Sequence, residues 1–119
     1  MFSIHTATRY LLYHGWADVR KSFDGLSGIV TNELKMPLQL GDVFIFLNKR
    51  QTHIKLLQWE GDGYSVYYKR LEEGTFELPL WACNGSHSVI TAKQLLLILQ
   101  GISLKKVVYR KRYLPPQAV

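Results

Sequence analysis

Three short apolar runs separated by brief turns constrain the fold of this chain more than any other feature. The runs are 43–48, 53–59 and 64–71, and each combines aliphatic residues with aromatic ones. The segments between them, 49–52 and 60–63, carry the polar residues and glycines that are typical of tight turns. Strands of this length joined by such short turns pair with their neighbours in antiparallel fashion. The sequence therefore predicts an antiparallel meander at the centre of the chain.

Other short segments extend this sheet to about four to six strands. We expect one strand at 9–13, one at 75–78 that Pro79 stops, and a last one at 107–109. The segment 81–88 is rich in Asn, Gly and Ser, and we interpret it as a loop.

A first helix is predicted at about 19–35, with Asp18 as its N-cap. Pro37 ends it, because the residue before a proline avoids helical geometry. Its buried face is expected to consist of the apolar residues that recur at helical spacing. These are Val19, Phe23, Leu26, Ile29, Val30 and Leu34.

A second helix is predicted at about 92–100, between an N-cap at Thr91 and a terminating glycine at Gly101. Residues 95–99 are apolar on nearly every side, so we expect this helix to be well buried. The expected fold is therefore a small α+β domain formed by residues 1–119, with a basic C-terminal tail at 103–119.

Pairing Trp59 with Tyr64 across the second turn fixes a register and divides the meander into two faces. One face is aliphatic and belongs in the core: Val43, Ile45, Leu47, Ile54 and Leu56. The other face carries aromatic residues and ends in polar and charged ones: Phe44, Phe46, Leu57, Trp59, Tyr64, Tyr68, His53, Lys55 and Arg70.

The aromatic face has two interpretations. Aromatic rings beside cations can stack on nucleic-acid bases while the cations neutralise phosphates. Alternatively, a helix covers the aromatic half and leaves the charges as a solvated rim. The sequence leaves both interpretations open.

The charge balance favours an anionic partner. The chain has 15 Lys and Arg against 9 Asp and Glu, a net charge of +6, as is common in proteins that bind nucleic acid. Simple solubility and local ion pairing are the alternatives. The candidate phosphate contacts are Arg20, Lys21, Lys49, Arg50, Lys55, Lys69, Arg70, Lys105, Lys106, Arg110, Lys111 and Arg112.

Two further features suggest a protein partner. Gly25 and Gly28 occupy the predicted helix, where glycine costs about 1 kcal/mol relative to alanine. A close approach by a strand of this domain, a partner chain or a phosphate backbone would explain them. Trp59 and Tyr64, if exposed, would add the aromatic anchors of a protein contact.

Signals for catalysis and metal binding are weak. Glu60 and Asp62 fit ordinary turn chemistry, and the histidines show no metal-ligand spacing with Cys83. Asp18, Asp24 and Asp62 would form a magnesium-dependent nuclease site only if the fold brought them together. We therefore expect no cofactor and no catalytic role. The single cysteine suits a reducing cytosol, and we expect no membrane span.

Several segments, in order along the chain, resemble the signature of a bacterial protein family. Residues 18–26, 18-DVRKSFDGL-26, are similar to its "D-M-R-K-G-F-D-G-L" pattern, with Ser22 in place of a common glycine. Residues 44–50, 55–63, 67–76 and 95–102 resemble its later motifs. The family is the second-open-reading-frame, TnpB-type accessory protein of insertion-sequence 66 transposons.

The resemblance implies an accessory role in transposition beside a larger transposase encoded by the same element. We therefore expect a non-catalytic cytoplasmic protein that binds DNA, such as the transposon ends, the transposase, or both. The alternative is a pure adaptor that docks on the transposase without touching DNA.

Overall fold

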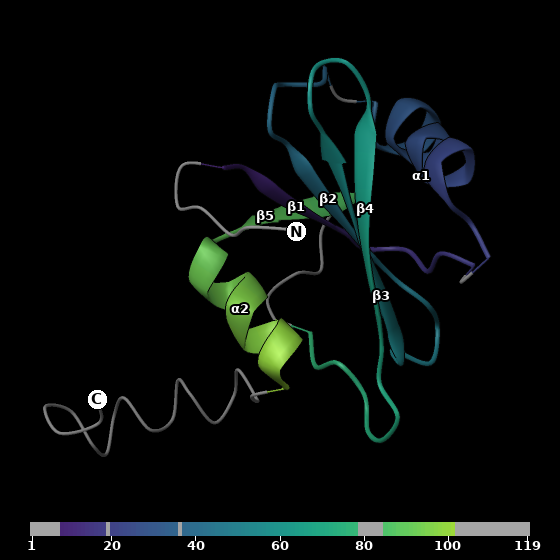
Figure 1. Cartoon of the computed structure of the whole chain (residues 1–119), viewed down its shortest axis with the longest axis vertical. Coiled ribbons are helices and arrows are strands. Elements are labelled where there is room, and N and C mark those ends of the chain that lie inside the picture. Colours follow the sequence, from purple (N-terminus) through teal and green to yellow (C-terminus); the bar gives the residue numbers. More distant parts are fainter. Residues whose placement is uncertain (1–7, 19, 36, 79–84, 102–119) are drawn as a thin grey trace, which may run out of the picture.

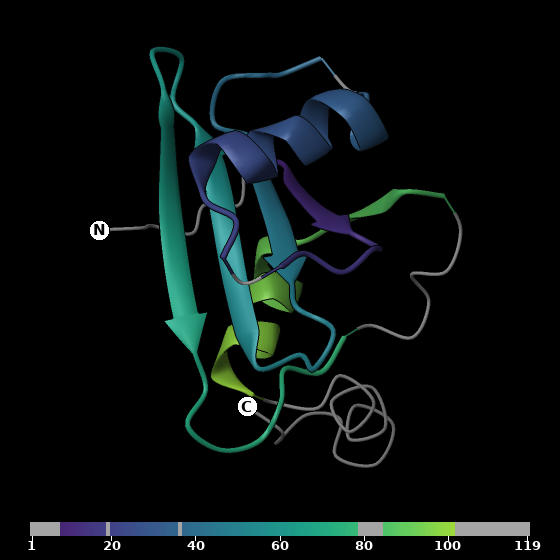
Figure 2. The same cartoon turned by 90° about the vertical axis from the view of Figure 1, so that its right-hand side faces the viewer.

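The computed structural model describes residues 8–18, 20–35, 37–78 and 85–101. They form a five-stranded sheet with a helix on each face (Figures 1 and 2). The elements, in chain order, are β1 (Tyr10–Tyr13), α1 (Phe23–Ile29), the π-helical turn η1 (Val30–Leu34), β2 (Val43–Leu47), β3 (His53–Trp59), β4 (Tyr64–Arg70), β5 (His87–Ile90) and α2 (Ala92–Gln100). The α+β class is confirmed.

The predicted meander is confirmed with its register. Strands β2, β3 and β4 pair in antiparallel fashion, with Trp59 opposite Tyr64 and Phe44 opposite Leu57. The backbone N–H of Asn48 donates to the carbonyl of His53 across the first turn. Because side chains alternate along each strand, the correct register also fixes which residues share a face.

The edges of the sheet differ from the prediction. The strand order is β4-β3-β2-β1-β5, and β1 runs parallel to β2. A parallel pair needs a crossover, which the segment containing α1 and η1 provides, so the sheet is mixed rather than a pure antiparallel meander. Strand β5 lies antiparallel to β1 and includes His87 and Ser88, so the predicted loop at 81–88 is wrong at these two residues.

The predicted strand at 75–78 is wrong. These residues adopt no regular structure, yet Phe76 is fully buried and its N–H donates to the carbonyl of Gln51. The apolar signal therefore reflects one core side chain rather than a strand. The predicted strand at 107–109 lies outside the described residues.

The first helix is shorter and less regular than predicted. Asp18 is not its N-cap, because its carboxylate instead accepts from the backbone N–H and guanidinium of Arg20. The helix begins at Phe23, whose ring is 47% exposed rather than in the core. It continues as η1 and ends at Lys35, a left-handed residue. The expected buried residues Leu26, Ile29, Val30 and Leu34 are confirmed, and Val19 lies outside the described residues.

The second helix is confirmed at both ends. Thr91 and Gln94 form a reciprocal capping box, and Gly101 takes the left-handed conformation that ends the helix. Leu95 and Ile98 are fully buried, whereas Leu96 is 43% exposed. The helix is therefore amphipathic rather than buried on every side.

The two faces of the sheet form two separate cores. The aliphatic face packs under α2, with Leu95 and Ile98 against Val43, Ile45 and other residues of that face. The aromatic face packs under α1 and η1, so that Phe44 and Phe46 are almost fully buried. Of the two interpretations of this face, the structure therefore favours coverage by a helix over most of its area.

One partly buried ion pair joins the beginnings of the two parallel strands. Two guanidinium nitrogens of Arg9 donate to the carboxylate of Asp42, at 3.0 and 2.5 Å, and the side chain of Asp42 is only 2% exposed while that of Arg9 is 28% exposed. The backbone N–H of Gln39 donates to the same carboxylate. Asp42 is the one buried polar or charged residue among those the structure describes. The hydrogen bond raises the pKa of Arg9, so the cation persists.

We expect Asp42→Asn to lower the free energy of unfolding by about 3 kcal/mol, since it leaves the Arg9 cation without its counter-charge. Asp62→Asn, in an exposed turn, serves as the matched control and should stay within about 0.5 kcal/mol of the natural protein. Urea denaturation measures both. Equal effects of the two substitutions would contradict a structural role for the pair.

A second contact predicts a pH dependence. The hydroxyl of Tyr13 donates to Glu33 at 2.5 Å, which raises the pKa of Tyr13 to about 12. The phenol of the unfolded chain titrates at about pH 10. The stabilisation of the folded state by this hydrogen bond is therefore fully present below that pH and is lost as the pH rises towards 12. Between these values the unfolding free energy should fall more steeply in the natural protein than in Tyr13→Phe. Equal dependence of the unfolding free energy on pH in the two proteins would contradict a stabilising bond between Tyr13 and Glu33.

A candidate nucleic-acid interface at one end of the sheet

The turn between β2 and β3 is held by side-chain hydrogen bonds. The side-chain oxygen of Asn48 accepts from the backbone N–H groups of Thr52 and His53, each at 2.9 Å. These bonds fix a short loop that presents Lys49 and Arg50 to solvent. Within the described residues, neither cation has a carboxylate partner, so both are available to a phosphate.

The adjoining ends of β3 and β4 place further groups beside this turn. His53 lies opposite Arg70, and Lys55 lies opposite Tyr68, as the sequence predicted. In Figure 2, α1 crosses the upper part of the sheet and does not reach these lower strand ends. Accordingly, Tyr68 is 50% exposed although it belongs to the same face as the buried Phe46.

The segment before α1 meets β3 at the ammonium of Lys55. This group donates to the carbonyl of Lys21 at 2.5 Å and lies 4.7 Å from the centre of the Tyr68 ring. Desolvation lowers the pKa of Lys55, while the charge of Asp18 opposes that shift. Lys21 is thereby placed next to Lys55.

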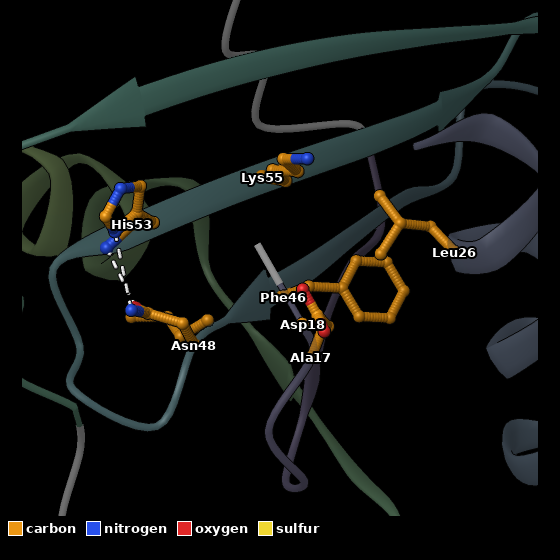
Figure 3. A pocket seen from close by; sticks show the side chains of 8 residues that line it. Ala17, Asp18, Leu26, Phe46, Asn48, His53 and Lys55 are labelled. Carbon is orange, nitrogen blue, oxygen red and sulfur yellow. Dashed lines mark hydrogen bonds between the residues drawn. The ribbon is translucent and has the colours of Figure 1, made fainter. Parts of the chain in front are cut away.

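A shallow cleft opens between these segments. Figure 3 shows Lys55 and His53 along β3, Asn48 beside His53, and Asp18 next to Phe46. Its cavity volume is about 10 Å³, roughly the room that one water molecule needs and far below the roughly 300 Å³ typical of small-molecule sites. The cleft therefore suits the edge of an extended ligand better than an enclosed substrate.

Two of the predicted phosphate contacts are engaged in exposed ion pairs. Arg20 contacts Asp18 at 2.8 Å, and Arg70 contacts Glu72 at 3.0 Å. The hydrogen bonds from Arg20 hold the pKa of Asp18 well below its usual range. Exposed pairs of this kind contribute little to stability, so a phosphate can replace the carboxylate.

Lys69 lies apart from the other predicted cations. It follows Tyr68 on β4 and therefore points to the face that α2 covers, where its ammonium donates to the carbonyl of Leu99 at 2.9 Å. A cation bound to the last turn of a helix stabilises that helix, because it interacts favourably with the negative end of the helix dipole. Its observed contact is thus structural.

The remaining candidate cations, Lys105, Lys106, Arg110, Lys111 and Arg112, lie outside the described residues, as does Cys83.

The residues predicted to contact a protein partner are divided in the structure. Gly25 and Gly28 lie on α1, and a side-chain carbon at Gly28 would meet nothing within 4 Å. No described strand approaches Gly28, so close approach by a strand of this domain does not explain that glycine. Trp59 and Tyr64 are half-buried rather than exposed, and their rings pack against each other at 5.0 Å.

The proposed nuclease site is not formed. Asp18 is paired with Arg20, and the turn of Asp62 lies at the far end of β3 from the cleft. In the part of the chain that the structure describes, no three His, Cys, Asp or Glu side chains gather closely enough to hold a metal ion. The hypothesis thus loses its proposed ligand set.

The sequence places Tyr68 and His53 on the face that could stack bases but not among the candidate phosphate contacts, and it assigns Asn48 no role in the site. The predicted register already placed Tyr68 and His53 beside Lys55 and Arg70. The register did not show how far α1 extends over the sheet. Because α1 does not reach this end of the sheet, Tyr68 is exposed.

Comparison with known proteins identifies the family. Residues 8–109 match the family described as IS66 Orf2-like protein. The chain is 28% identical over 90 residues to the uncharacterized protein y4jC of Sinorhizobium fredii, covering 76% of this chain and 75% of that protein. It is 31% identical over 88 residues to y4hO of the same organism, covering 74% and 75%.

No solved structure matches the chain significantly. None of the described helices is long and apolar enough to cross a membrane. The family match spans most of the sequence and agrees with the ordered motifs found in it. The chain belongs to the IS66 Orf2-like family of transposition accessory proteins.

Proposed function

We propose that this protein is a non-catalytic accessory factor of transposition that binds DNA through a cationic rim at one end of its sheet. The rim consists of six of the predicted cations: Arg20, Lys21, Lys49, Arg50, Lys55 and Arg70. The observation that carries the proposal is that these residues, although scattered in the sequence, come from segments that adjoin one another in the structure.

Direct contacts connect the parts of the rim. Lys55 bonds to the backbone of Lys21, and His53 lies opposite Arg70 in the sheet. Asn48 ties the Lys49–Arg50 turn to His53. These contacts support the proposal that the six cations share one surface, which is what binding to a phosphate backbone requires.

The family supplies the biological setting. An accessory protein of a transposable element works where DNA and a transposase are both present. We propose that the transposase of the same element is a second partner. Binding to DNA would be driven by charge and depend weakly on sequence, because phosphate contacts carry no sequence information.

The alternative proposal is a pure adaptor for the transposase. One observation favours it: Leu40 is 76% exposed in the loop before β2, and it approaches Gly61 in the β3–β4 turn. Trp59 and Tyr64 flank that turn, at the opposite end of the sheet from the cationic rim. An exposed leucine beside half-buried aromatics is a suitable protein contact.

We expect the Lys49→Ala/Arg50→Ala double variant to bind duplex DNA more weakly and to lower the slope of log affinity against log salt by about 2. Gel-shift titration at increasing salt measures this slope. Lys93→Ala, exposed on α2, is a control that removes one cation outside the rim and should leave the slope unchanged.

Absence of binding by the natural protein at low salt would overturn the DNA proposal. Stable co-purification with the transposase, combined with that absence, would establish the adaptor alternative.

Lys69 provides a test of position rather than charge. Lys69→Ala should lower the free energy of unfolding by about 1 kcal/mol, because it removes the bond to the end of α2. It should leave the salt slope of DNA binding unchanged. A drop in slope equal to that caused by a single rim substitution would contradict the structural role of Lys69.

A further inference from the structure

Tyr68 is the exposed end of an otherwise covered aromatic face. Phe44 and Phe46 on the same face are 0% and 2% exposed, whereas Tyr68 is 50% exposed. The difference arises because α1 and η1 pack over the upper part of the sheet, where Tyr64 and Val66 of β4 join the same core, and leave the end of β4 that carries Tyr68 uncovered. A large half-exposed ring is therefore presented at the cationic rim itself.

The immediate neighbours of this ring are positively charged or aromatic. The ammonium of Lys55 lies 4.7 Å from the ring centre, and the imidazole of His53 lies nearly parallel to the ring at 5.9 Å. Arg70 follows two residues later on the same strand face.

The imidazole of His53 is held in place by residues of the turn that precedes it. Its Nδ1 atom is 2.7 Å from the hydroxyl of Thr52 and 3.4 Å from the side-chain nitrogen of Asn48. Figure 3 shows His53 and Asn48 joined at the end of the strand. The ring pair is thus preorganised by the same turn that carries Lys49 and Arg50.

We propose that Tyr68, with His53 beside it, is a stacking platform for an unpaired base of single-stranded DNA, whose flanking phosphates contact Arg70 and the Lys49–Arg50 turn. The inference deepens the proposed function and depends on it for the identity of the ligand. Stacking on aromatic side chains combined with cationic contacts to the backbone is how proteins hold single strands without reading their sequence.

The geometry favours an unpaired base over a duplex. In a duplex the faces of the bases are stacked on one another and are closed to a side chain lying on a sheet surface. A ring on a β-sheet can reach a base only when the base is splayed out. The ligand class is therefore a single strand, or a duplex end whose strands have separated.

The experiment compares three DNA ligands: a single strand of about 15 nucleotides, the same strand carrying abasic residues, and the corresponding duplex. Abasic residues keep the phosphates and remove the stacking partners. We expect the natural protein to prefer the normal single strand to the abasic strand by about tenfold, as one or two stacked bases would give.

Tyr68→Leu should remove this preference and leave duplex affinity unchanged. Tyr68→Phe, which keeps the ring, should retain the preference. The Lys49→Ala/Arg50→Ala variant should weaken all three ligands alike. Thermal unfolding of each variant establishes that it is folded.

Two failures are distinguishable. If Tyr68→Leu discriminates between normal and abasic strands as the natural protein does, or if the natural protein does not discriminate at all while still binding the duplex, the stacking site is refuted and the proposed function stands. If no DNA is bound at low salt, the proposed function itself is refuted.

Discussion

Burial of β2 on both faces is the constraint on which the rest of the structure depends. All five of its side chains are buried, with Val43, Ile45 and Leu47 on one side and Phe44 and Phe46 on the other. A strand that is apolar on both faces requires cover on both. Helix α2 provides it for the aliphatic face, and α1 with η1 for the aromatic face. The layered fold follows from this one strand.

The same constraint determines where function can lie. Because α1 is needed over the two phenylalanines, the aromatic face is not an open platform, and the part that remains exposed lies around Tyr68. The core under α1 and η1 supports this view, since Tyr64 and Val66 of β4 pack against it whereas Tyr68 on the same strand is half exposed.

The sequence predicted those features that depend on neighbouring residues. Short turns fixed the register of β2, β3 and β4, and local capping fixed both ends of α2. It did not predict features created by distant contacts. The parallel pairing of β1 with β2 brings Arg9 next to Asp42, 33 positions away in the chain. The failure of Asp18 as an N-cap is by contrast local, because its carboxylate binds the cation of Arg20. The cationic rim was predicted in composition, yet Lys69 could be separated from it only once the register was combined with the position of α2.

Ion pairing limits what two of the six rim cations can contribute to DNA binding, and that bears on how the protein would select its ligand. Arg20 and Arg70 are already paired with Asp18 and Glu72, so a phosphate must displace a carboxylate and gains only the difference between two exposed ion pairs. Duplex DNA presents only its phosphates to the rim, because its bases are stacked on one another. A splayed base would add stacking on the part of the Tyr68 ring that Lys55 and His53 leave exposed. Weak electrostatics combined with one stacking site would therefore favour the strand ends and distorted regions that transposition generates over the bulk of the intact duplex.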